Sequence, residues 1–219
     1  MSKSYQGYMG PQIGKLGTAV GRMWKGRPVM AAYQKNVANP NTLPQQLVRA
    51  RFAACGKMAT ACLTAIQEGM GYAAKQLRLT ESNVFVKDNF SKFTAVSPDE
   101  VNISYSGIKF SKGTLPSVTF GVVDFGEGEH LHLSVALTGN SDAPGAMADD
   151  KVYILAYCPE LQQGILSLPT MRSSSTISMA LPSAWDGMDI HVYGFTVTGP
   201  HQSKKRVSYT TYCGTGEVA

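Results

Sequence analysis

The sequence EGEHLH, residues 127–132, has the residue types of a metal site. His130 and His132 alternate onto one face of a predicted strand, where Glu127 or Glu129 would add oxygen ligands. The spacing identifies no further ligand, and paired histidines on a solvent-facing strand are ordinary. We therefore expect no metal ion at this cluster.

No nucleophile and base stand at a spacing that indicates catalysis. Ser173–Ser175 reads as a polar turn, and Cys158 ends the apolar run KVYILAY, so it is expected in the core. No Asp or Glu stands at a spacing from His191 or His201 that indicates a catalytic acid–base pair. GPQIGKL, residues 10–16, places three residues between its glycines, whereas a phosphate-binding loop has four and follows its lysine with Ser or Thr. We expect no enzyme activity and no cofactor.

Positive charge is concentrated at the start of the chain. Residues 1–67 contain nine Lys or Arg and no Asp or Glu, whereas the remaining residues hold eleven Lys or Arg against fifteen acids. A surface of one sign attracts polyanions or an acidic partner at range. The residues expected to meet nucleic acid or an acidic subunit surface are Arg22, Lys25, Arg27, Arg49 and Arg51.

The elements that carry these cations begin with a predicted hairpin of Thr18–Trp24 with Arg27–Tyr33. Gly26 supplies a positive φ for the turn, and Pro28 disfavours a helix. Trp24 has two interpretations: it packs as the apolar anchor of the hairpin, which we favour, or it lies among the cations to contact nucleic acid. We expect these residues to contact a neighbouring subunit: Gly17, Val20, Gly21, Met23, Trp24, Gly26 and Val29.

A long amphipathic helix is predicted after the hairpin. Thr42 and Gln45 match a capping box, and the helix is expected to end near Gly69 and Gly71. Its apolar face is formed by Val48, Phe52, Cys55, Ala59, Cys62 and Ile66. A further helix is expected over Glu81–Phe93. The four cysteines have no paired spacing and are expected as buried free thiols.

From Val101 onward, short alternating apolar runs are separated by Gly, Pro, Asn, Asp and Ser, which is typical of an antiparallel β-sandwich. The expected strands are Val101–Phe110, Ser117–Asp124, His130–Leu137, Lys151–Tyr157, Gly164–Leu168, Thr176–Leu181, Ile190–Thr198 and Val207–Cys213. The fold class is therefore mainly β with α. We expect three segments: a Gly-rich basic arm with the hairpin (1–41), a helical segment (42–98) and the sandwich (99–219).

The chain resembles a family of uncharacterised proteins widespread in Bacteroidetes, catalogued only as a domain of unknown function. The resemblance rests on motifs spread over nearly the whole chain: GKLGTAVGRMWKG, NPNTLPQQLVRARF, SGIKFSKGTLP, DKVYILAYCPELQQGI, LPSAWDGMDIHVYGFTV and RVSYTTYCG. It implies an immunoglobulin-like or fibronectin-like sandwich at the C-terminal end, with a jelly roll as the other strand order. It implies no activity and no catalytic residue.

Two functions remain open from the sequence. The first is a structural assembly protein, such as a phage- or prophage-type virion component, that forms a homo-oligomer through its basic arm. The alternative is a monomeric immunoglobulin-like binding module that recognises a protein or glycan through the loops Thr138–Asp150 and Gly199–Arg206. The sequence has no signal peptide and no membrane-spanning run, so we expect synthesis in the cytoplasm, no membrane partner and, for an assembly protein, a place in the virion.

Overall fold

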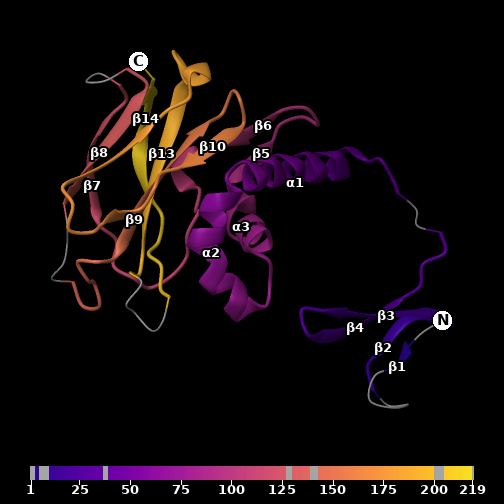
Figure 1. Ribbon diagram of the computed structural model, residues 1–219. Helices are drawn as coiled ribbons and strands as arrows, with labels where there is room; N and C mark the ends of the chain where they lie inside the picture. The colour runs from indigo at the N-terminus through magenta and orange to yellow at the C-terminus, as the bar shows by residue number, and fades with distance from the viewer. Residues whose placement is uncertain are drawn as a thin grey trace. The chain divides into compact units, whose positions relative to one another are not determined.

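The computed structural model describes residues 3–4, 10–36, 39–126, 130–138, 143–199 and 205–218. The chain divides into two compact units, Met1–Gln45 and Gln46–Ala219, which we call the N-terminal unit and the body (Figure 1). We expected separate helical and sandwich segments divided near residue 98. In the structure the three helices and the sandwich strands lie in the same compact unit.

The N-terminal unit contains a four-stranded antiparallel sheet, which we call the arm sheet. Its strands are β1 (Lys3–Ser4), β2 (Gln12–Leu16), β3 (Ala19–Trp24) and β4 (Arg27–Ala32), in the order β1-β2-β3-β4. The β3–β4 pairing confirms the predicted hairpin. The structure adds a strand that was not predicted from the sequence, β2, which pairs with β3.

Two tight turns set the register of the arm sheet. Lys25 and Gly26 have φ of 45° and 75° and join Trp24 to Arg27, as in a type I′ turn. Gly17 has φ of 57° in the turn between Leu16 and Ala19. The positive φ expected for Gly26 is therefore present, and Gly17 has the same requirement.

The body begins with the helices α1 (Leu43–Ala61), α2 (Leu63–Leu77) and α3 (Glu81–Asn89). Our single long helix is wrong in two respects: it breaks at Cys62, and α2 continues through Gly69 and Gly71. Gly69 has a packing role, because a Cβ there would overlap the carbonyl oxygen of Phe110 and the Gly69 carbonyl accepts a bond from Lys112 N at 3.1 Å. The predicted helix at Glu81 is confirmed and shorter, with Thr80 accepting from Asn83 N at its start.

The strands of the body form two larger sheets and one hairpin. A five-stranded sheet has the order β10-β9-β13-β14 with β11 on the other part of β9, and a three-stranded sheet has the order β12-β8-β7. The bounds are β5 Phe93–Ala95, β6 Val101–Ile103, β7 Thr119–Asp124, β8 His132–Thr138, β9 Lys151–Cys158, β10 Gln163–Leu166, β11 Thr170–Met171, β12 Thr176–Ala180, β13 Asp189–Val197 and β14 Thr211–Glu217. All pairings are antiparallel, as expected for the predicted fold class.

The five-stranded sheet is covered on both faces (Figure 1). On one face Tyr153, Leu155 and Phe195 pack against the helices, and on the other Ile154 and Val192 pack against the three-stranded sheet. The body is therefore a β-sandwich with a third, helical layer. This explains why the β9 sequence, KVYILAYC, is almost continuously apolar.

Two expected strands differ from those observed. The run Val101–Phe110 is a strand only to Ile103, pairs with β5 and then forms a 3₁₀ turn at Tyr105–Gly107. The last strand lies at Thr211–Glu217 rather than Val207–Cys213. Its glycines weaken the sequence signal, yet Gly216 lies where a Cβ would meet the ring of Phe125.

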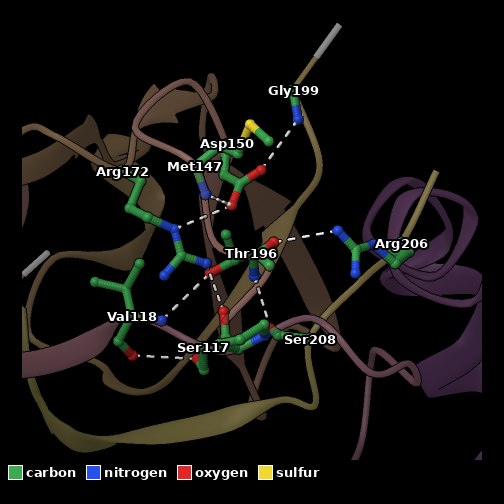
Figure 2. A network of polar contacts seen from close by, with 11 residues as sticks. Ser117, Val118, Met147, Asp150, Arg172, Thr196, Gly199, Arg206 and Ser208 are labelled. Atoms are coloured by element: carbon green, nitrogen blue, oxygen red, sulfur yellow. Dashed lines mark hydrogen bonds and ion pairs between the residues drawn. The ribbon is translucent and has the colours of Figure 1, made fainter. Parts of the chain in front are cut away.

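A buried ion pair ties several loops of the body together (Figure 2). Asp150 and Arg172 are fully buried, with Arg172 Nε 3.2 Å from Asp150 Oδ2. The Asp150 carboxylate also accepts from Met147 N at 2.9 Å and Gly199 N at 3.4 Å, and Arg172 donates to the Pro116 carbonyl. Four separate segments thus meet at one charge pair, and the C-terminal part of the loop Thr138–Asp150 is anchored.

Candidate interaction surface on the arm sheet

The register of the arm sheet sorts its side chains onto two faces. Directly paired residues share a face, and successive residues alternate. One face, which we call the apolar face, carries Leu16, Ala19, Met23, Pro28, Met30 and Ala32, together with Gly14 and Gly21. The opposite face, which we call the cationic face, carries Lys15, Val20, Arg22, Trp24, Arg27, Val29, Ala31 and Tyr33.

The large side chains of the apolar face are not covered by the described residues of the N-terminal unit. Leu16, Met23 and Met30 are 46%, 44% and 58% exposed. Among the described residues of the N-terminal unit, Gly21 alone is buried, and a Cβ there would overlap the carbonyl oxygen of Gln12. Gly21, predicted as a subunit contact, is therefore held by a close backbone approach within the arm sheet, whereas Gly17 has open space around it.

Strand β4 leaves an open hydrogen-bonding edge. Tyr33 N donates to Thr18 O at 2.6 Å, and bonded and non-bonded pairs alternate in an antiparallel ladder. Val29 and Ala31 therefore bond to β3, and the backbone groups of Pro28, Met30 and Ala32 point away from it. Pro28 has no N–H, so it fits an outward position without weakening the hairpin.

The cationic face places two exposed aromatic rings among three cations. The Nζ of Lys15 lies 3.9 Å from the centroid of the Tyr33 ring. Trp24 pairs directly with Arg27, and Arg22 lies diagonally across from Arg27. Trp24 is 38% exposed and Tyr33 is 42% exposed, so Trp24 is not the buried anchor that we favoured from the sequence.

The five predicted polyanion-binding residues lie in different places. Arg22 and Arg27 share the cationic face, Lys25 occupies the hairpin turn, and Arg49 lies exposed on α1 of the body. Arg51 has a structural role that its sequence spacing did not indicate. Its guanidinium donates to the carbonyls of Phe93 at 2.7 Å and Phe90 at 3.0 Å and stacks on the Phe90 ring.

The predicted apolar stripe of the long helix is only partly covered. Cys55, Ala59, Cys62 and Ile66 are buried, whereas Val48 and Phe52 are 53% and 58% exposed. The N-terminal half of α1 therefore presents a second apolar surface, on the body. Within the body, these two side chains contribute little to the core.

A cleft of about 420 Å³ in the body is lined by α1, the β5–β6 hairpin and the end of β9. Near it, Tyr105 stacks on His191, whose Nδ1 lies 2.9 Å from the hydroxyl of Tyr212. Burial lowers the pKa of His191, so the ring is neutral at pH 7. This cluster packs aromatic rings and satisfies their polar atoms.

The four cysteines are free thiols as expected, with Cys55, Cys62 and Cys158 buried but Cys213 only half-buried. Burial raises the pKa of Cys55 to about 11 and the pKa values of Cys62 and Cys213 to about 12, so these thiols stay protonated at neutral pH. No group of three or more His, Cys, Asp or Glu in the described ranges is placed to hold a metal ion. Glu127 and Glu129 of the sequence cluster lie outside those ranges.

The described helices do not combine the length and apolar character that a bilayer crossing requires. No curated protein matches the chain. A family model matches residues 10–214, and its description reads "Family of unknown function (DUF6266)". Because this match covers almost the whole chain, from the arm sheet to β14, the protein belongs to the DUF6266 family.

Proposed function

We propose that the protein is a non-enzymatic assembly component, of the structural kind found in phage or prophage virions, whose N-terminal unit joins neighbouring copies. One observation carries the proposal: the large side chains of the apolar face, Leu16, Met23 and Met30, are 44–58% exposed, and only Gly21 is buried among the described residues of the N-terminal unit. A small sheet needs a covered apolar face for stability. A neighbouring subunit supplies that cover.

The open edge of β4 supports the same role. Met30 and Ala32 offer N–H and C=O groups to an added strand, and the side chains of both residues lie on the apolar face. A strand from a second copy would bond to this edge and extend the sheet. Two contacts of different chemistry, apolar packing and strand addition, then hold the same neighbour.

The test is the mass of the untagged protein by size-exclusion chromatography with light scattering. We expect the full-length chain to form a defined oligomer and a chain lacking residues 1–35 to run as a folded monomer. A full-length monomer of 23.5 kDa would contradict the proposal and favour the binding-module alternative. The same oligomer from the truncated chain would show that the arm sheet is not the connector.

A matched pair of variants separates the two faces. Met30→Lys puts a charge on the apolar face, whereas Ala31→Lys puts the same charge on the cationic face one residue away. We expect Met30→Lys to abolish or strongly weaken the oligomer and Ala31→Lys to preserve it. Equal loss of the oligomer in both variants would contradict a specific role of the apolar face.

A further inference from the structure

We infer that the cationic face of the arm sheet binds single-stranded nucleic acid, with Arg22, Arg27 and Lys15 on the phosphates and Trp24 and Tyr33 stacking on bases. This inference rests on the proposal that the N-terminal unit is an interaction element. It names a partner for the cationic face, which the proposed subunit contacts do not use. The apolar face and the β4 edge are used by the neighbouring copy. The cationic face is on the other side.

Charge complementarity carries the first step. Residues 1–45 contain six Lys or Arg and no Asp or Glu, so no acidic side chain of this unit neutralises the cations. The register gathers Lys15, Arg22 and Arg27, from β2, β3 and β4, on one side of the arm sheet. Such a surface releases counterions when it binds a phosphate backbone.

The aromatic residues carry the second step. Trp24 and Tyr33 lie on the same face as the cations, and both rings remain exposed. Exposed rings flanked by cations are what single strands require, because unpaired bases stack on aromatic side chains while the backbone follows the positive charge. In a duplex the bases are already stacked, so these rings would gain nothing from it. The arrangement therefore favours a single strand over a duplex.

The test uses the full-length protein and a labelled oligothymidylate of about 20 nucleotides, longer than the ~4–16 nucleotides that small single-strand-binding folds cover. We expect saturable binding by fluorescence anisotropy. The double variant Arg22→Gln/Arg27→Gln should weaken it by about tenfold or more. It should also reduce the slope of log affinity against log salt by about 0.7 for each lost phosphate contact.

The control removes the same charge from the body. Lys75 and Lys87 are exposed on α2 and α3, and the double variant Lys75→Gln/Lys87→Gln should stay within about twofold of the wild type, since both lie outside the arm sheet. A control that weakens binding as much as the arginine variant would overturn the site. Ala31→Lys, which adds a cation to the same face, should strengthen binding.

Tryptophan fluorescence reports the stacking step directly. The chain has two tryptophans, and Trp185 is fully buried in the body, so quenching by the oligonucleotide reports on Trp24. We expect quenching and a loss of affinity of about fivefold or more for Trp24→Ala. Binding without quenching, equal affinity for a duplex, or equal affinity for polyglutamate would each overturn a single-strand site, as would no binding.

Light scattering, measured beside oligonucleotide binding, distinguishes the assembly proposal from the nucleic-acid inference. The arginine variant should lose the oligonucleotide and keep its oligomer, whereas Met30→Lys should lose the oligomer and still quench Trp24 fluorescence on binding. If the wild type assembles but binds no oligonucleotide, this inference fails and the proposed function stands. If the wild type is a monomer that binds the oligonucleotide, the proposed function fails and the cationic face is still a nucleic-acid site.

Discussion

Strand β9 of the body and strand β4 of the arm sheet are both apolar in sequence, yet their surroundings are opposite. Seven consecutive residues of β9, Val152–Cys158, are buried between the helical layer and the three-stranded sheet. Every residue of β4 is exposed. The body therefore supplies its own apolar cover, and the N-terminal unit does not. Both core clusters lie in the body, and the N-terminal unit is the part for which we propose contacts with a second copy.

Among the variants that test this comparison, we expect the largest loss of unfolding free energy at the buried ion pair of the body. Arg172→Met leaves the Asp150 carboxylate buried without its cation, which costs about 3–5 kcal/mol of unfolding free energy. Urea denaturation measures this loss. As a control, Lys112→Met removes a pair whose lysine side chain is 38% exposed and should cost about 0–1 kcal/mol. Equal losses would contradict the claim that Asp150–Arg172 is a key contact of the body.

Replacing either of two glycines of α2 with alanine should change the stability by a smaller amount, in opposite directions for the two. Gly69→Ala would push a Cβ into the carbonyl oxygen of Phe110 and should destabilise the body by about 1–3 kcal/mol. Gly71→Ala meets nothing within 4 Å and should stabilise the helix by about 0.5–1 kcal/mol. Thermal unfolding of the two variants should therefore shift in opposite directions. Shifts in the same direction would show that Gly69 is not held by packing.

Removing the arm sheet should have the smallest effect on stability. A chain lacking residues 1–35 retains all residues of both core clusters, so its unfolding free energy, measured as a monomer, should change by less than about 0.5 kcal/mol. The reference is the Met30→Lys variant at the same concentration. A loss of several kcal/mol would mean that the body depends on the N-terminal unit.

The sequence predicted elements whose signal is local. Gly26 and Pro28 identified the hairpin, and alternating runs identified most sandwich strands. Strand β2 and the last strand were missed or displaced because glycines weaken a strand pattern, although Gly216 is required by the ring of Phe125. The break between α1 and α2 at Cys62 has no local signal in the sequence, because no side chain there caps α2.

Only part of the candidate site could be predicted from the sequence. Charge counting found Arg22 and Arg27 but could not separate them from Arg51, whose carbonyl partners lie about forty residues away along the chain. Conversely, the two faces of the arm sheet follow from the hairpin turn. Once Lys25 and Gly26 are its central residues, the pairing places Met30 opposite Gly21 and Arg22 opposite Val29. The exposure of Trp24 did not follow, because it depends on what covers each face.

The central claim is that the arm sheet is completed by a second copy. Residue-resolved hydrogen exchange by mass spectrometry tests it most directly, with the full-length protein compared under dilute and concentrated conditions. The amides of Met30 and Ala32 point away from β3, so we predict that they exchange freely in the monomer and become protected when the oligomer forms. An oligomer in which these two amides still exchange freely would contradict strand addition at β4.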